Sequence, residues 1–260
     1  MPTLQNNKNQ LTFWEHLDDL KSSIVRIVVA IVGFGMVAFM FKEPLFKLLL
    51  APKYDTFVTY RLLQAMVGGE IEGFSVELIN TGLAQQFMVH LKAAFAVGIL
   101  LASPYIIYQL FKFVSPALYS QERSAAVKLV TSGYIMFLLG VALNYFVIFP
   151  LTFRFLGTYQ VSTNVENLIT IDSYMSTLLM LSLMMGVMFE IPVLSWLMAK
   201  IGVLTASFMR TYRRHALVVI LILAAVITPT TDIFTLLVVS LPIYLLYEVS
   251  IFIVRRCEKS

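Results

Sequence analysis

Six apolar runs, each bounded by charged or turn-forming residues, constrain this sequence more than any other feature. Several of them approach or exceed the roughly 20 residues that an α-helix needs to cross a bilayer. Of the 260 residues, 59% are hydrophobic and 13% are charged, against about 25% charged residues in an average soluble domain. A soluble fold would need a polar exterior that this composition does not supply, so we expect a membrane protein.

The runs predict an all-α, polytopic integral membrane protein with one transmembrane domain over residues 1–260. We expect six spans, at about 23–41, 87–114, 127–149, 174–198, 216–227 and 233–254. The third span should end at Pro150, because proline cannot continue the helical hydrogen bonds. The fifth span, of roughly 12 residues, is short for a hydrocarbon core of about 30 Å, so it must lie in thinned bilayer or behind other helices.

Two connections outside the spans carry local signals. Thr12 and Glu15 have the spacing of a capping box, so the first helix should begin outside the membrane and carry Asp19 on its polar face. Residues 1–20 lack an apolar core with a cleavage site, and we expect no cleaved signal. The first loop, about 42–86, is long enough to be partly structured, with a short interfacial helix over 43–50 that stops near Pro52.

The positive residues set the expected orientation. Lys and Arg gather at the N-terminus, in the second and fourth connections and in the C-terminal tail: Lys8, Lys21, Arg26, Lys112, Arg123, Lys128, Lys200, Arg210, Arg213, Arg214, Arg255, Arg256 and Lys259. The positive-inside rule therefore predicts that both termini and the turn with Glu122 are cytoplasmic, with Arg213 and Arg214 as a topology anchor. The net charge of +4 follows from this pattern and does not require a nucleic-acid partner.

No catalytic constellation is present in the sequence. His16, His90 and His215 fall in separate parts of the chain, and Cys257 is the only cysteine. Paired-cysteine metal motifs, glycine-rich phosphate loops and nucleophile elbows are absent. We therefore expect no enzyme activity, no cofactor and no metal.

Glu190 lies in the fourth apolar run, where an acidic side chain costs on the order of 2–4 kcal/mol on insertion scales. Pro192, two residues later, offers no N–H to the carbonyl of Met188, so the helix should be weakened around Glu190 and could kink or admit water. Two interpretations are open. A protonated Glu190 could simply bond to a neighbouring helix, or the residue could have a function, as intramembrane acids usually do.

Asp19 and Glu122 have two interpretations as well. Each lies at an expected helix end near the cytoplasmic headgroups, where it could be solvated or paired with Lys21 or Arg123. Such exposed pairs are common and weak. A functional role at a fixed depth near the headgroups is equally compatible with their positions.

Several motifs, in the same order, resemble the TatC family, the large membrane subunit of the twin-arginine protein translocase. They are Ser103–Arg123, His16–Lys21, Phe189–Val193, Thr228–Pro229 with Asp232, and Pro242–Ile251. The similarity extends from about Phe13 to Phe252. Asp19 stands where the family usually has Glu, Lys21 where it usually has Arg, and Ser23 where a second Arg is common.

The resemblance implies a six-helix concave bundle whose hollow face holds Glu190. It implies that Asp19 and Glu122, with Lys21 and Arg123 beside them, bind the paired arginines of signal peptides on folded precursor proteins, since carboxylates form charge-assisted bidentate bonds with guanidinium groups. Glu190 would dock small single-span partners of the TatA and TatB type, which assemble on demand under the proton gradient. Pro52 and Asp232 match functionally sensitive loop positions.

The resemblance also implies a location in the cytoplasmic (inner) membrane, with self-association and without nucleotide. Two other classes remain as alternatives. A proton-coupled secondary transporter would use Glu190 to carry a coupling proton and would need a binding cavity near the midplane. A passive scaffold would only hold other membrane proteins together.

Overall fold

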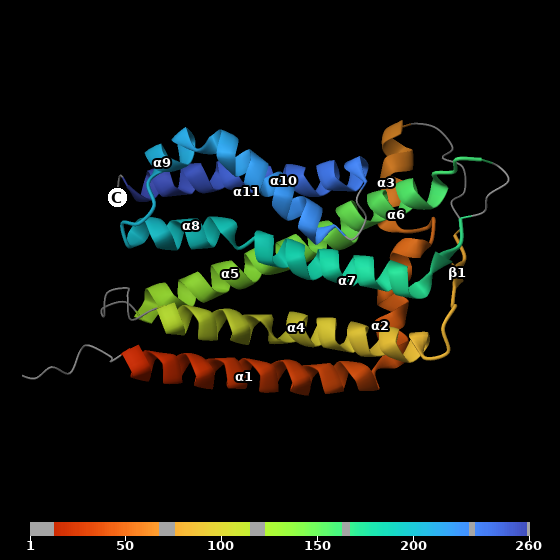
Figure 1. Cartoon of the computed structure of the whole chain (residues 1–260), viewed down its shortest axis with the longest axis horizontal. Coiled ribbons are helices and arrows are strands. Elements are labelled where there is room, and N and C mark those ends of the chain that lie inside the picture. Colours follow the sequence, from red (N-terminus) through yellow and green to blue (C-terminus); the bar gives the residue numbers. More distant parts are fainter. Residues whose placement is uncertain (1–12, 68–75, 115–122, 163–166, 229–231, 259–260) are drawn as a thin grey trace, which may run out of the picture.

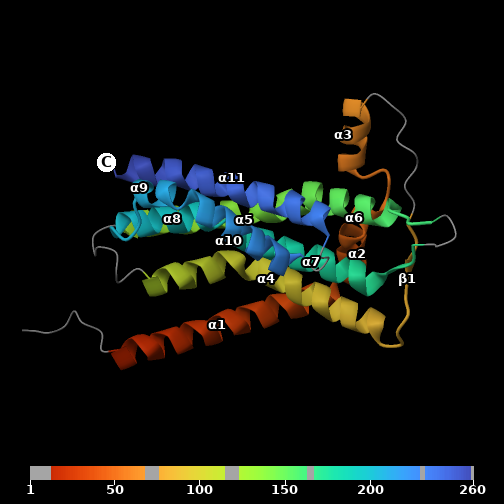
Figure 2. The same ribbon diagram turned by 45° about the horizontal axis from the view of Figure 1, so that its top comes forward.

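The computed structural model describes residues 13–67, 76–114, 123–162, 167–228 and 232–258. The long helices lie side by side along one direction (Figures 1 and 2). They are α1 (Phe13–Met40), α4 (Gln85–Val114), α5 (Arg123–Leu143), α7 (Ile171–Met188), α8 (Ile191–Lys200), α10 (Arg213–Ile227) and α11 (Ile233–Cys257). The all-α, membrane-spanning class is thereby confirmed.

Five stretches in the described part of the chain are long and apolar enough to cross a membrane: Leu17–Met40, Gln85–Lys112, Leu129–Thr158, Ile171–Lys200 and Ile233–Cys257. They match the expected spans except the fifth, where α10 has 15 residues. At 1.5 Å per residue α10 is about 22 Å long. It packs against α11 and α7, so neighbouring helices cover part of this short span. With α10 counted as the short fifth span, the described part of the chain has the six expected spans.

The third span does not end at Pro150, and that prediction is wrong. After α5 the chain makes a wide π-helical turn, η3 (Asn144–Ile148), in which the Phe149 N–H donates to the Asn144 carbonyl, and continues as α6 (Phe149–Thr158). Pro150 occupies the first turn of α6, where its missing N–H is tolerated. The carbonyl of Phe146, which an N–H at position 150 would otherwise meet, accepts the hydroxyl of Thr59 instead.

The fourth span is broken where the sequence indicated. α7 ends at Met188 and α8 begins at Ile191, with Pro192 in the first turn of α8. At the junction the Glu190 N–H donates to Val187, three residues back, at 3.0 Å. The two helices thus form one span with a tightened turn in its middle.

The first loop is more structured than its sequence suggested. The expected interfacial helix is α2 (Lys42–Leu49), followed by the short η1 (Ala51–Lys53). Unexpected elements are α3 (Val58–Val67) and β1 (Leu78–Ile79), which pairs in parallel with β2 (Ile169–Thr170). α9 (Ala206–Thr211), before α10, was not expected either. A cluster including Phe57, Tyr60, Phe153 and Tyr174 joins the loop to α6 and α7.

α1 is the least buried of the candidate spans, with 6% of its most apolar window buried. It packs chiefly against α4 and, at its end, against α2. A Cβ added to Gly98 of α4 would lie 2.7 Å from the Ile31 carbonyl oxygen and 2.8 Å from the Gly35 nitrogen. These backbones approach so closely because position 98 has no side chain, as in other small-residue contacts between membrane helices.

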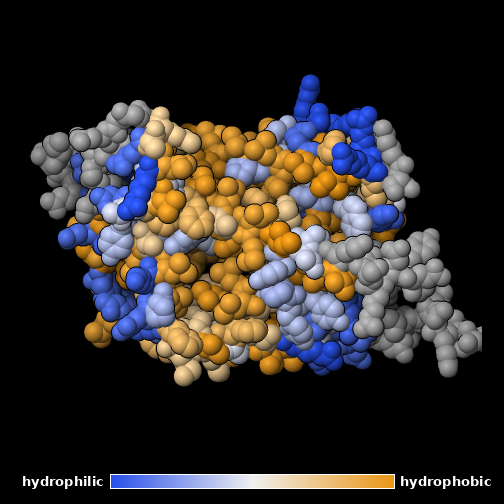
Figure 3. Space-filling view, turned by 180° about the vertical axis from the view of Figure 1, so that it is seen from behind, coloured by the Kyte–Doolittle hydropathy of each residue, from blue (hydrophilic) through white to orange (hydrophobic). Residues whose placement is uncertain are grey.

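Seen from behind, the surface of the molecule carries a broad hydrophobic band with hydrophilic residues at both ends (Figure 3). Every long helix has exposed large apolar side chains, among them Val29, Met36, Leu101, Val226 and Leu241. An exposed apolar surface of this extent is what lipid, not water, solvates.

Candidate functional site

Glu190 lies at the junction of α7 and α8 and is half-buried. Its carboxylate lies against Gly133 of α5, because a Cβ added to that glycine would be 3.1 Å from Glu190 Oε2. The same added atom would be 3.2 Å from Ile107 and 3.4 Å from Phe111, both on α4. The acid therefore projects from the broken helix into a small space that Gly133 leaves open among apolar side chains.

The other carboxylate oxygen, Glu190 Oε1, is buried and has no hydrogen-bond partner among the described residues. The interpretation of Glu190 as an acid bonded to a neighbouring helix thus receives no support from the described contacts. An unpartnered buried oxygen costs on the order of 1–3 kcal/mol. A polar group brought in by another molecule would remove that cost.

The N-terminal site residues lie on α1. Asp19 and Lys21 are both exposed there. Glu122 lies outside the described residues, and α5 begins at the next residue, Arg123, whose side chain is also outside the description. The start of α1 and the start of α5 lie at the same end of the bundle (Figures 1 and 2).

That end of the molecule is also the basic end. The last turns of α4, α8 and α11 and the start of α10 lie there (Figure 1) and carry Lys112, Lys200, Arg255, Arg256, Arg213 and Arg214. Loop helices α2 and α3 and the strand β1 lie at the opposite end (Figure 1). These six residues, which were used for the orientation rule, thus lie at one end of the described structure.

Pro52 is buried within η1. Its carbonyl oxygen lies 3.1 Å from the Tyr60 hydroxyl, which lies equally close to the Pro150 carbonyl. Burial raises the pKa of the Tyr60 hydroxyl, against an opposing effect of Arg154, so the hydroxyl stays protonated and able to donate. Tyr145 and Tyr174 donate to the carbonyls of Leu48 and Leu49 at 2.7 and 3.0 Å. Tyrosines thus fix the segment around Pro52 to the spans.

Asp232 precedes α11 and acts as its N-cap, since its Oδ1 accepts from the Thr235 N–H at 2.6 Å. Glu190, Pro52 and Asp232 therefore belong to different elements, and the structure does not bring them together into one site. Among the described residues no group of three His, Cys, Asp or Glu side chains could hold a metal ion.

Sequence reasoning missed two polar links. Arg213 of the expected anchor bonds to Glu248 of α11 at 2.7 Å, and Tyr244 donates to the same carboxylate at 3.2 Å. Fully buried Asn144 in η3 donates to Ser182 of α7 at 2.8 Å. An Arg beside the fifth run and a Glu inside the sixth are visible in the sequence and could have suggested the first link.

Comparison with known proteins gives one consistent result. The sequence profile of the family described as Sec-independent protein translocase protein (TatC) matches residues 15–242. The TatC of Blattabacterium from Periplaneta americana is 31% identical, with 96% of this chain and 97% of that protein aligned. The TatC of Aquifex aeolicus is 31% identical, with 92% of each aligned.

The fold comparison agrees with the sequence comparison. A solved structure titled as the crystal structure of the twin-arginine translocase receptor TatC superposes with a TM-score of 0.77 and 30% identity. The match covers 94% of this chain and all of that one. The chain therefore belongs to the TatC family of Sec-independent protein translocase proteins.

Proposed function

We propose that this chain is the receptor subunit of a twin-arginine protein translocase. It binds the paired arginines of signal peptides on folded precursor proteins and does so without catalysis of its own. It resides in the cytoplasmic (inner) membrane with both termini in the cytoplasm, and it nucleates a complex that the proton gradient drives.

The observation that carries this proposal is the common end of α1 and α5 in a chain of the TatC family. Asp19 is exposed near the start of α1, and Glu122 directly precedes α5. Two carboxylates at one membrane face suit a ligand with two planar guanidinium groups, each able to donate paired hydrogen bonds to a carboxylate. Lys21 and Arg123, beside the two acids, would then limit their mutual repulsion.

Glu190 supports a second contact, with small single-span partners of the TatA and TatB type. Its buried Oε1 has no partner among the described residues, and part of the residue is exposed at the helix break, so a partner helix that contacts the break would offer this carboxyl group a hydrogen bond. Pro52, tied down through Tyr60, and Asp232, at the start of α11, would keep the loops around these contacts in place. Self-association belongs to the same assembly.

Signal-peptide cross-linking to membranes that contain the protein tests the receptor role. Glu122→Ala should weaken cross-linking to a twin-arginine peptide roughly 10- to 150-fold, because a charge-assisted bond to Arg contributes about 1.5–3 kcal/mol. Asp19→Ala should weaken it less, since the shorter side chain reaches less far. A peptide with two lysines serves as the control. Normal binding and export by both variants would refute the site, and solute uptake by vesicles that contain this chain alone would favour the transporter.

Variants of Glu190 test the partner contact. Glu190→Ala should leave the unfolding temperature and signal-peptide cross-linking unchanged and abolish cross-linking to partner helices, because the polar contact is lost. Glu190→Gln, which keeps hydrogen-bonding capacity, should retain part of the partner contact. Gly133→Val should mimic Glu190→Ala by filling the space beside the carboxylate, whereas Gly33→Val, where an added Cβ meets nothing within 4 Å, is the matched control. Unchanged partner contacts in Glu190→Ala would reject this role.

A further inference from the structure

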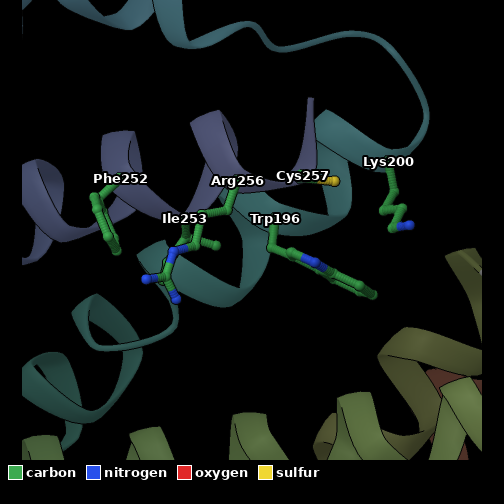
Figure 4. A pocket seen from close by; sticks show the side chains of 6 residues that line it. All are labelled: Trp196, Lys200, Phe252, Ile253, Arg256 and Cys257. Atoms are coloured by element: carbon green, nitrogen blue, oxygen red, sulfur yellow. The ribbon is translucent and has the colours of Figure 1, made fainter. Parts of the chain in front are cut away.

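A cavity of about 370 Å³ opens between the last turns of α8 and α11. Trp196 and Lys200 of α8 line it together with Phe252, Ile253, Arg256 and Cys257 of α11. At about 30 Å³ per water, the cavity has room for roughly a dozen waters, which is enough for a phosphodiester headgroup. Figure 4 shows the Trp196 side chain between the two cations, with Arg256 on the side of Phe252 and Lys200 on the other side.

Two cations border the cavity, and in the described part of the chain neither is in an ion pair. The ion pairs there join Lys92 to Asp172 and Arg213 to Glu248. The acid nearest in sequence to Arg256, Glu258, accepts instead from the backbone N–H of Ala206 at 2.7 Å. Both pocket cations are exposed, so their charge is available to an anion.

Aromatic rings hold these cations beside an apolar surface. The Arg256 guanidinium lies 4.5 Å from the centroid of the Phe252 ring, and the Lys200 ammonium lies 6.0 Å from that of Trp196. The Phe252 side chain is 54% exposed. The cavity therefore offers positive charge at the end of two spans and aromatic surface one turn deeper along the same helices.

Charge outside and apolar surface inside match the order of groups in a membrane lipid, with phosphate at the interface and acyl chains below it. Long basic side chains at helix ends often only reach toward water. Here one basic residue from each of two helices lines the same cavity, and basic pockets between transmembrane helices are a known setting for anionic headgroups. We propose that this cavity binds an anionic glycerophospholipid, with Lys200 and Arg256 supplying the positive charge that attracts the phosphate and Trp196 and Phe252 lying against an acyl chain.

Tryptophan quenching by brominated lipids tests the proposal directly. The chain has two tryptophans, Trp14 and Trp196, so a Trp14→Phe background leaves Trp196 as the sole probe. The full chain is reconstituted into phosphatidylcholine vesicles that contain increasing fractions of phosphatidylglycerol or phosphatidylcholine with brominated acyl chains. Brominated phosphatidylglycerol should reach half-maximal quenching at a roughly 10- to 30-fold lower fraction, as expected for two basic contacts.

Lys200→Gln with Arg256→Gln should reduce that preference to about 2-fold or less, because neutral amides attract phosphate weakly. Arg210→Gln with Arg255→Gln removes the same charge from the same end of the molecule without altering the cavity lining, and it should keep the preference. Gel filtration and thermal unfolding verify that both double variants are folded.

Equal quenching by the two lipids in the parent protein would overturn the proposal without any variant. An equal loss in both double variants would also overturn it, since it would trace the preference to general surface charge. If millimolar inorganic phosphate abolished the preference, the cavity would be a site for free anions and not for lipid. Absence of quenching together with a disulfide-linked dimer through Cys257 would place a second copy there and refute lipid binding.

Discussion

Glu190 and Asp232 show two ways in which this chain holds an acid near a helix start. Asp232 Oδ1 accepts a backbone N–H of α11, so the side chain has a structural role that needs no partner. Glu190 precedes α8 but makes no such capping bond, and its Oε1 has no partner among the described residues. The capping acid should therefore tolerate loss of charge without loss of function, whereas Glu190 should lose part of its partner contact when it becomes glutamine.

Substitutions at Asp232 separate capping from charge. Asp232→Ala should destabilise the protein by about 0.5–2 kcal/mol, the usual cost of losing an N-cap, while Asp232→Asn should stay within a few tenths of a kcal/mol because asparagine caps equally well. Thermal unfolding in detergent measures both values. Export assays on the same proteins should follow stability; a stable Asp232→Asn protein that fails to export would show that the charge itself is required.

For single residues, the sequence was sufficient to identify the acids of interest but not the residues that surround them. Glu190 could be found because an acid in an apolar run is costly and Pro192 marks the break. Gly133 could not be assigned to the site from the sequence, because glycine occurs in membrane helices for many structural reasons. Only the packing of α5 against α8 shows that this glycine lies beside Glu190.

Among the elements, the contact between α1 and α4 is closest at one glycine of α4. Gly98 lets the α4 backbone approach Ile31 and Gly35 to a distance that any Cβ would prevent. Helix association in lipid relies on such close packing because lipid tails are as apolar as the side chains. α1, which carries Asp19, is thus joined to the bundle mainly through this seam with α4.

Gly98→Leu should separate α1 from α4. We expect a loss of about 1–3 kcal/mol of stability, the usual cost of overpacking, together with weaker cross-linking of signal peptides to α1. Gly33→Leu is the matched control, because it adds the same side chain on α1 where no neighbour lies within 4 Å. If both variants unfolded at the temperature of the parent protein, the seam would not hold α1 in place.

Helix boundaries could be predicted where nearby residues determine them. The prediction failed where an element distant in sequence determines the boundary. The break at Glu190 follows from Pro192 alone. The continuation through Pro150 does not, because it relies on Thr59 of α3, 87 residues away in sequence from Phe146. α3 itself was missed because a loop helix of ten residues has no signal as strong as a membrane span.

For the molecule as a whole, the basic residues and the position of the loop helix α3 indicate the same orientation. The C-terminus lies at the basic end, and α3 lies at the other (Figure 1). Reporter fusions after residue 258 and within residues 55–67 should therefore report opposite sides of the membrane, with the C-terminal fusion in the cytoplasm. Fusions in the short connection after α8 act as an internal control and should agree with the C-terminal fusion. Two reporters on the same side would invalidate the orientation.

The low burial of α1 has a consequence for biogenesis. Its main neighbour, α4, ends at Val114, so on the order of 4–15 s of synthesis separate the release of the two helices at 5–20 residues per second. During that time α1 must persist in lipid by itself. Only 6% of its most apolar window is buried in the finished protein, against 39–44% in the other four spans. Because the first helix is stable in lipid by itself, later helices can carry polar residues that need neighbouring helices around them. Lys92 and Gln109 of α4 are examples.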